Sequence, residues 1–221
     1  MPKSDHRETS QFYLEMTSTR RVITWIGEPL FKTIWKITLT GREHIPARGP
    51  VVAVANHLTL LDMFPMQIAL LPRTMFFKAK SNLFFNPGFS AFIRRLGAFP
   101  VRRGTVDKWA IEHSNKVLAA GQVLGIFPEG TRSRGGLREG KPGAAQLALK
   151  ANAPILPMAV TGTEHTFKPG HRRAHVHVAV GAPLYPRPAD TAETFIDRVM
   201  CALAAMLPPE YRGCYAGKIN A

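Results

Sequence analysis

Residues 51–71 read VVAVANHLTLLDMFPMQIALL and contain the pattern that decides the fold. The stretch begins with five apolar residues at 51–55, which is the length and composition of a fully buried strand. A short polar turn follows, and residues 62–71 are predicted to form a helix. A strand buried on both faces and followed directly by a helix is typical of a parallel sheet covered by helices.

The same alternation continues along the chain. We expect further buried strands at 75–77, 98–101, 123–127 and 155–160. The helices between them are predicted at 87–96, 106–120 and 142–151, with Thr105 as an N-cap and Gly121 as a C-terminal stop. A strand with one exposed face at 174–180 and a helix at 191–207 follow. The predicted fold class is therefore α/β, with a mostly parallel central sheet flanked by helices.

Composition limits the kinds of partner. The chain has 221 residues, 45% hydrophobic and 20% charged, which excludes a disordered or fibrous protein. With 29 Lys+Arg against 15 Asp+Glu, the formal charge of +14 favours anionic partners: nucleic acid, anionic lipid, phosphorylated substrates or an acidic carrier protein. Two cysteines, Cys201 and Cys214, form no disulfide framework and indicate a reducing compartment.

The N-terminal region is amphipathic. Residues 20–37 (RRVITWIGEPLFKTIWKI) place apolar side chains at three- and four-residue steps beside Lys and Arg, and predict one or two helices with a break at Gly27 and Pro29. Such helices either pack on their own domain or lie in a membrane interface through residues such as Trp25 and Trp35. We expect membrane-associating helices at 1–40 and an α/β domain at 41–221, without a signal peptide or a spanning helix.

His57 and Asp62 form the first candidate site. Histidine suits proton transfer near neutral pH, and a carboxylate on its second ring nitrogen fixes the tautomer. Five helical steps of about 100° would leave the two side chains about 140° apart, so they meet only if His57 lies in the turn after the strand and Asp62 begins the next helix. In isolation, the pair would more often be a structural histidine and a helix-dipole aspartate.

Arginines gather after the other predicted strands, in Gly97-Ala98-Phe99-Pro100-Val101-Arg102-Arg103 and in Phe127-Pro128-Glu129-Gly130-Thr131-Arg132-Ser133. Open α/β sheets bind ligands at the carboxyl ends of their strands, and arginine binds phosphate in a bidentate way. The sequence therefore places a candidate base and phosphate ligands at one edge of the sheet.

The four blocks NHLTLLD, GAFPVRR, FPEGTRS and APILP, in this order and spacing, resemble the glycerolipid acyltransferases, and among them the bacterial 1-acyl-sn-glycerol-3-phosphate acyltransferases. The resemblance covers about residues 41–162. It implies that His57 is the general base and Asp62 its orienting partner, and that a free hydroxyl attacks the thioester of acyl-CoA or acyl-carrier protein without a covalent acyl-enzyme. No metal and no cofactor beyond this co-substrate is implied.

The resemblance also implies roles for the other blocks. Residues expected to bind the acceptor and its phosphate are Lys80, Arg102, Arg103, Glu129, Gly130, Thr131 and Arg132. Pro157 would lie on the acyl-donor side as a structural residue. Thr59, Asn82 and Arg102 depart from the family pattern, where serine, glutamate and aspartate are usual.

The expected reaction is acylation of the sn-2 hydroxyl of lysophosphatidic acid to phosphatidic acid, by a peripheral protein on the cytoplasmic side of the cell membrane. The expected partners are a lysophospholipid, acyl-CoA or acyl-carrier protein, and an anionic membrane surface, and not nucleic acid. Another lysolipid as acceptor, such as a lyso-ornithine lipid, and a non-catalytic module binding anionic lipid or nucleic acid remain as alternatives. A P-loop at 135–141 is disfavoured by Pro142, and a metal site at His175 and His177 lacks carboxylates.

Overall fold

The structure is a computed structural model that describes residues 5, 7–8, 10, 12–14, 18–102, 104–133, 136–168 and 173–219. The side chains of residues 19, 20, 23–25 and 28 lie outside the description. Trp25 and Arg103, both named from the sequence, are therefore not placed.

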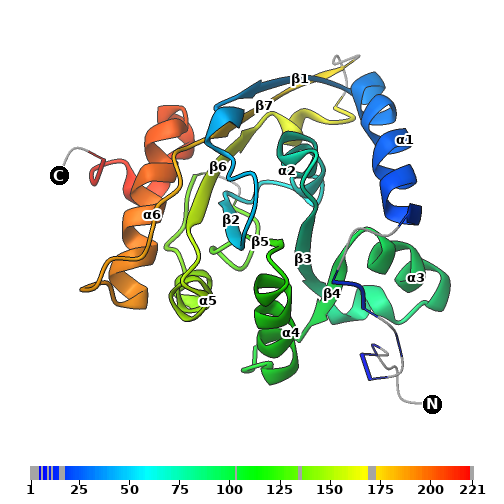
Figure 1. The fold of residues 1–221 in the computed structure, drawn as a ribbon. Coiled ribbons are helices and arrows are strands. Elements are labelled where there is room, and N and C mark those ends of the chain that lie inside the picture. Colours follow the sequence, from blue (N-terminus) through cyan, green and yellow to red (C-terminus); the bar gives the residue numbers. More distant parts are fainter. Residues whose placement is uncertain are drawn as a thin grey trace.

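A seven-stranded sheet forms the centre of the molecule (Figure 1). Its strands are β1 (Trp35–Thr40), β2 (Val51–Ala55), β3 (Met75–Lys80), β4 (Ala98–Val101), β5 (Val123–Ile126), β6 (Ile155–Thr161) and β7 (Ala174–Val180). Their order is β1-β7-β6-β2-β5-β3-β4. Every neighbouring pair is parallel except β6 and β7, so β6, β2, β5, β3 and β4 all end at the same edge.

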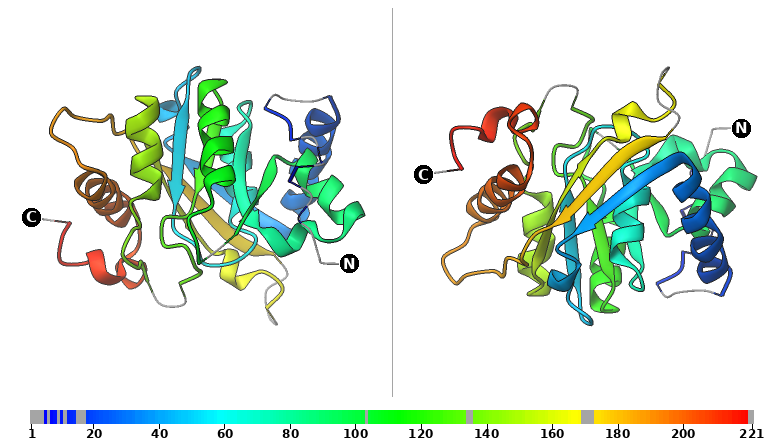
Figure 2. Two further views of the ribbon diagram at one scale, coloured as in Figure 1. Left: turned by 90° about the horizontal axis from the view of Figure 1, so that it is seen from below. Right: turned by 90° about the horizontal axis from the view of Figure 1, so that it is seen from above.

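Six α-helices are described: α1 (Ser18–Ile34), α2 (Met63–Leu70), α3 (Pro87–Arg95), α4 (Lys108–Ala119), α5 (Gly143–Ala151) and α6 (Ala192–Met206). Helices α4, α5 and α6 pack on one face of the sheet and α2 on the other, while α1 and α3 lie at the end away from α6 (Figure 2). Short 3₁₀ turns occupy Arg42–His44, Ser81–Phe84, Thr163–His165, Pro209–Tyr211 and Gly213–Tyr215. None of the helices in the described ranges is long and apolar enough to cross a membrane.

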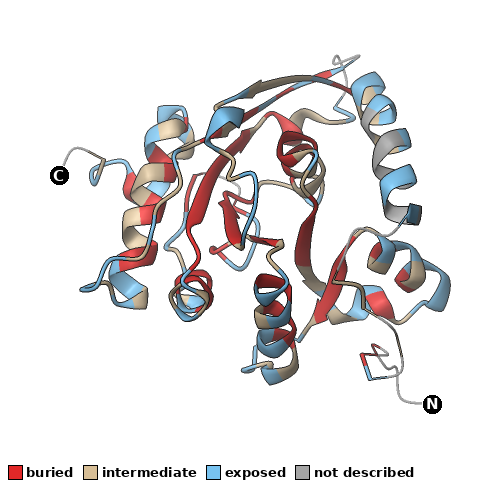
Figure 3. Ribbon diagram, viewed as in Figure 1, coloured by how far each residue is buried: buried red, intermediate tan, exposed pale blue. Residues whose placement is uncertain are grey.

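The apolar run at 51–55 explains the position of β2. All five of its residues are buried, because β5 and β6 flank the strand and helices cover both faces (Figure 3). At the edge of the sheet, β7 alternates buried and exposed residues, as its sequence predicts. The predicted α/β class, with a mostly parallel sheet flanked by helices, is confirmed.

Three local predictions are wrong. Helix α1 continues through Pro29 without the expected break, and residues 35–40, predicted to belong to the helical region, form strand β1. Trp35 is therefore 1% exposed within the sheet and is not part of a membrane-facing surface. Asp107, and not Thr105, caps α4, because its carboxylate accepts the amide hydrogen of Ala110.

Candidate active site

The site lies at the carboxyl edge shared by the five parallel strands. His57 follows β2, Glu129 follows β5, Lys80 ends β3, Arg102 follows β4 and Thr163 follows β6. These residues are far apart in the sequence, and the parallel topology brings them to one edge, as in other open α/β sheets.

His57 and Asp62 meet as the sequence predicts. The Nδ1 atom of His57 lies 2.9 Å from Oδ2 of Asp62. His57 lies in the turn after β2, and Asp62 immediately precedes α2. The Asp62 carboxylate makes no capping hydrogen bond to α2, so it is not a helix cap and instead faces back toward the histidine.

Five donors surround the Asp62 carboxylate, which is completely buried. The amides of Leu58 and Thr59 donate to Oδ2 at 2.7 and 2.8 Å, in addition to His57. The Thr59 hydroxyl donates to Oδ1 at 3.1 Å, and the Thr163 hydroxyl donates to the same oxygen at 2.5 Å. Because both oxygens of the Asp62 carboxylate already accept hydrogens from other donors, the hydrogen of the contact with His57 lies on Nδ1.

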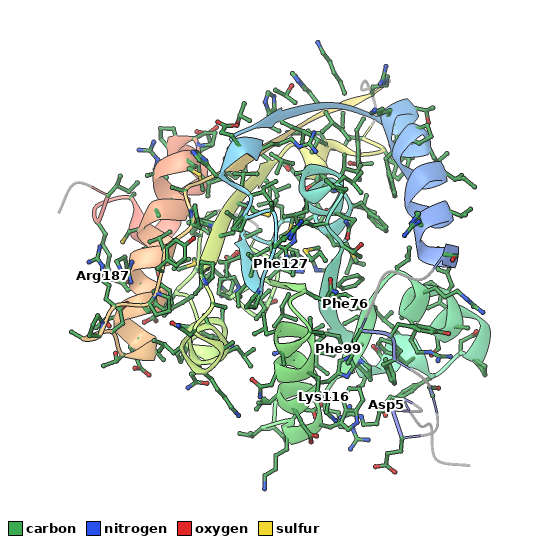
Figure 4. All side chains as sticks on the ribbon, viewed as in Figure 1. Asp5, Phe76, Phe99, Lys116, Phe127 and Arg187 are labelled. Atoms are coloured by element: carbon green, nitrogen blue, oxygen red, sulfur yellow. The ribbon has the colours of Figure 1, made fainter. Side chains whose placement is uncertain are left out.

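The second ring nitrogen of His57 is left free to act as a base. Within the described residues, Nε2 has no hydrogen-bond partner. The ring stacks on Phe127, with centroids 4.1 Å apart and an angle of 14° between the planes. Phe127 projects from the end of β5 near the middle of the sheet (Figure 4). One nitrogen held by Asp62 and one face held by Phe127 fix the direction of Nε2.

Glu129 binds the backbone of His57. Its Oε1 accepts the amide hydrogen of His57 at 2.9 Å, and its Oε2 accepts the amide hydrogen of Arg138 at 3.0 Å. Glu129 is 3% exposed, and burial raises its pKa, although the amides of Arg138 and His57 offset part of this rise. The amide of Ser133 in turn donates to the His57 carbonyl at 2.8 Å. The FPEGTRS block therefore holds the backbone of His57 on both sides.

Asn56, the residue before His57, is bound to β6 through its own side chain. Its amide nitrogen donates to the Val160 carbonyl at 2.7 Å, and the Val160 amide donates to its carbonyl oxygen at 2.8 Å. Sequence reasoning did not assign roles to Asn56, Thr163, Ser133 or Phe127 in this geometry. Asn56, Ser133 and Phe127 stood inside the recognised blocks, but nothing in the sequence linked Thr163 to Asp62, which lies 101 residues earlier.

The cations predicted for the acceptor lie around the same edge. Lys80, Thr131 and Arg132 are exposed, and Arg102 has a side chain that is 62% exposed. Gly130 adopts a φ of 70°, a left-handed conformation that favours glycine in the turn after Glu129. These residues therefore follow strands that end at the same edge as β2 and His57.

Pro157 lies apart from this group. It is buried within β6 in register with Val54, and its carbonyl accepts the amide hydrogen of Gly181 at 2.9 Å. A role on the acyl-donor side remains a prediction. No group of three or more potential metal ligands occurs in the described residues.

The comparisons with known proteins agree with this geometry. Residues 36–161 match the model of the family described as Acyltransferase. This chain belongs to the acyltransferase family. The match starts at β1 and ends at the last residue of β6, so it includes all the strands that end at the candidate site.

Several relatives of this acyltransferase have more specific names. A 1-acyl-sn-glycerol-3-phosphate acyltransferase of Bacillus subtilis is 29% identical over 149 residues, covering 67% of this chain and 74% of that protein. A protein of the same name from Chlamydomonas reinhardtii is 33% identical over 195 residues, or 81% of this chain and 55% of its own length. The crystal structure of the 1-acyl-sn-glycerophosphate (LPA) acyltransferase PlsC from Thermotoga maritima has a TM-score of 0.69 and 25% identity, covering 91% of this chain and 80% of that one.

Proposed function

We propose that this acyltransferase transfers a fatty acyl group from a thioester, acyl-CoA or acyl-carrier protein, to the sn-2 hydroxyl of lysophosphatidic acid. The product is phosphatidic acid, which makes the protein an enzyme of phospholipid biosynthesis. The observation that carries the proposal is the oriented His57–Asp62 pair, with a free Nε2, at an edge lined by Lys80, Arg102 and Arg132. The names of the relatives support the choice of acceptor.

The histidine performs the proton transfers. Nε2 of His57 takes the hydroxyl proton as the acceptor oxygen attacks the thioester carbonyl, and Asp62 stabilises the imidazolium that forms. The tetrahedral intermediate then breaks its carbon–sulfur bond, and the thiolate leaves with the proton returned by His57. General base catalysis of this kind contributes about 10²–10⁴ in rate.

The remaining polar groups serve the acceptor. Lys80, Arg102, Arg103, Gly130, Thr131 and Arg132 are proposed to surround the acceptor phosphate and glycerol. Arginine pairs with phosphate oxygens through two parallel hydrogen bonds, and lysine acts as a point charge. Glu129 is proposed to act mainly through the backbone of His57, because both of its oxygens already accept amide hydrogens.

A peripheral position on a membrane is also proposed, on its cytoplasmic face. Val22, Ile26 and Leu30 follow one another at four-residue steps on α1, and their exposed fractions are 54%, 54% and 57%. Arg21 and Lys32 on the same helix are exposed. An apolar stripe beside cations is typical of a helix that lies in an anionic lipid surface.

Thiol release from acyl-CoA and from acyl-carrier protein tests the reaction, with the lipid product identified by mass. We expect release that depends on lysophosphatidic acid, and phosphatidic acid as product, from the wild type and from His177→Ala, in which an exposed histidine on β7 is removed. The folded His57→Ala variant should lose this activity. Turnover only with another lysolipid would reassign the acceptor, and no turnover with any lysolipid would overturn the enzymatic proposal.

A further inference from the structure

A cluster of four charged residues joins the N-terminal segment to the turn after β4, and its members are Asp5, Arg7, Arg102 and Asp107. The described residues of that segment (5, 7–8, 10 and 12–14) precede the family match, which begins at residue 36. Two of them, Asp5 and Arg7, are only 3% and 7% exposed. Asp5 is labelled in Figure 4, below β4 and beside α4. Burial of charged side chains is costly unless they are paired, so these contacts require an explanation.

Asp107 is the centre of the cluster. Its Oδ2 accepts the amide hydrogen of Arg102 at 2.8 Å, and its Oδ1 accepts the amide hydrogen of Ala110 at 3.1 Å. The first contact closes the turn that follows β4, and the second caps α4. The position of Asp107 therefore determines where the backbone of Arg102 lies relative to the sheet.

Arg7 holds Asp107 in place. Its Nη1 donates to both carboxylate oxygens of Asp107 at 2.7 and 2.9 Å, and its guanidinium lies 5.1 Å above the ring of Trp109 on α4. The opposite edge of the guanidinium donates to Asp5, with Nη2–Oδ2 at 2.6 Å and Nε–Oδ1 at 3.0 Å. Asp5 then accepts from Nε of Arg102 at 3.3 Å.

Arg102 is thus held at two points by this cluster. Asp107 holds its amide, and Asp5 holds its side chain. Burial would raise the pKa of Asp5, but the hydrogen bonds and charges of Arg7 and Arg102 outweigh it and lower the pKa. Burial would also raise the pKa of Asp107. The hydrogen bonds from Arg7 and from the amides of Arg102 and Ala110 outweigh this effect and lower the pKa. Both carboxylates are therefore ionised near neutral pH and bind the guanidinium groups as anions.

A second contact holds the N-terminal segment through Phe12 and involves neither Arg102 nor Asp107. The ring of Phe12 packs edge-on against Trp109 at 5.2 Å and His113 at 5.6 Å, and the Arg94 guanidinium lies 5.7 Å above it. The N-terminal segment is therefore held by an aromatic contact on α4 and by the ion cluster.

We infer that Asp5 and Arg7 are positioning residues of the acyltransferase, which act through Asp107 to set Arg102 at the acceptor edge of the site. The inference rests on the proposed function, in which Arg102 binds the phosphate of the acceptor. It assigns a role in the reaction to a segment outside the family match.

Steady-state kinetics of the full chain test this role. We expect Arg7→Ala to raise the KM for lysophosphatidic acid about tenfold, with kcat and the KM for the acyl donor within about twofold of wild type, because only acceptor placement is disturbed. Arg7→Lys keeps the charge but loses the planar fork, and should raise the same KM by a smaller factor. Lys116→Ala is the matched control, because it removes an exposed ion pair with Glu112 on the same α4 helix.

Hydrogen exchange at the Arg102 amide provides a readout that is independent of turnover. Arg7→Ala should speed that exchange about tenfold, while Lys116→Ala leaves it unchanged. The inference is overturned if active Arg7→Ala has the wild-type KM for lysophosphatidic acid. It is also overturned if Arg7→Ala loses only kcat and thermal stability. If the wild type itself shows no turnover, the proposed function fails. Unchanged exchange of the Arg102 amide in Arg7→Ala would separately overturn the positioning role.

Discussion

The amide of His57 donates a 2.9 Å hydrogen bond to Oε1 of Glu129, so the residue proposed as the base is held by a carboxylate 72 positions later. The other oxygen of Glu129 binds the Arg138 amide, and the side chain is nearly inaccessible to solvent. The Glu-Gly turn after β5 is therefore part of the support of the catalytic pair, in addition to any contact with the acceptor.

Glu129→Gln should lower kcat about 10- to 100-fold. The glutamine amide can accept only one of the two amide hydrogens and presents its own N–H group to the other, and an unpaired buried donor costs about 1–3 kcal/mol. Steady-state kinetics with lysophosphatidic acid measure the effect. Glu139→Gln, at an exposed carboxylate of the same loop, should behave like the wild type, and an equal loss in both variants would contradict the interpretation.

Asp62→Asn should lower kcat by about 10²–10⁴, because an amide in place of the carboxylate no longer fixes the hydrogen on Nδ1 of His57. The KM for either substrate should change little, since Asp62 is completely buried. Kinetic constants and thermal unfolding together separate this effect from misfolding. A folded Asp62→Asn variant with wild-type kcat would exclude the proposed pair.

Thr163→Val should lower kcat about threefold to tenfold without a change in KM. The variant keeps the shape of the side chain but removes the 2.5 Å hydrogen bond to Oδ1 of Asp62, leaving Thr59 as the hydroxyl donor to that oxygen. Thr38→Val is the matched control, because the Thr38 hydroxyl contacts an exposed histidine, His175, on the neighbouring strand. Identical kinetics in the two variants would show that the Thr163 contact has no part in orienting the pair.

The fold and the pair at 57 and 62 could be predicted because each rests on a local pattern. An apolar run buried on both faces identifies β2, and the spacing of five permits only the turn-and-helix arrangement that is observed. Strand β1 could not be predicted, because Trp35 and Ile37 fit the periodicity of the preceding helix, and only pairing with β7 makes them a strand. Thr163 and Arg7 were also missed, since their partners lie about 100 residues away and tertiary structure alone brings them together.

His113 should make stability depend on pH. It is 8% exposed between Trp109 and Phe99, and burial, with a smaller effect of Lys116, lowers its pKa from 6.5 to about 4. The unfolded chain therefore binds more protons than the folded chain between these values, and stability falls as pH falls from 6.5 to about 4. The loss from this group should be about 2 kcal/mol.

Urea unfolding at pH 7.5 and pH 4.5 measures this dependence. His113→Phe keeps an aromatic ring in the site and should lose about 2 kcal/mol less than the wild type on acidification. His177→Ala, which removes an exposed histidine, should retain the wild-type dependence. The interpretation is wrong if His113→Phe and the wild type lose the same free energy.

Helix α1 should bind lipid through its exposed stripe while its other face packs on the protein. Phe31 stacks on Trp35 with ring centroids 4.9 Å apart, and also contacts Phe64, whereas Ile26 and Leu30 are more than half exposed. Ile26→Ser with Leu30→Ser should therefore reduce cosedimentation with vesicles containing phosphatidylglycerol about tenfold while leaving the fold intact, because both side chains already contact water.

Tyr185→Ser, at another exposed apolar side chain beyond β7, should sediment like the wild type. Unchanged cosedimentation of the double variant would place membrane contact elsewhere on the molecule, and Trp35→Ser would not test it, since Trp35 is buried in the sheet.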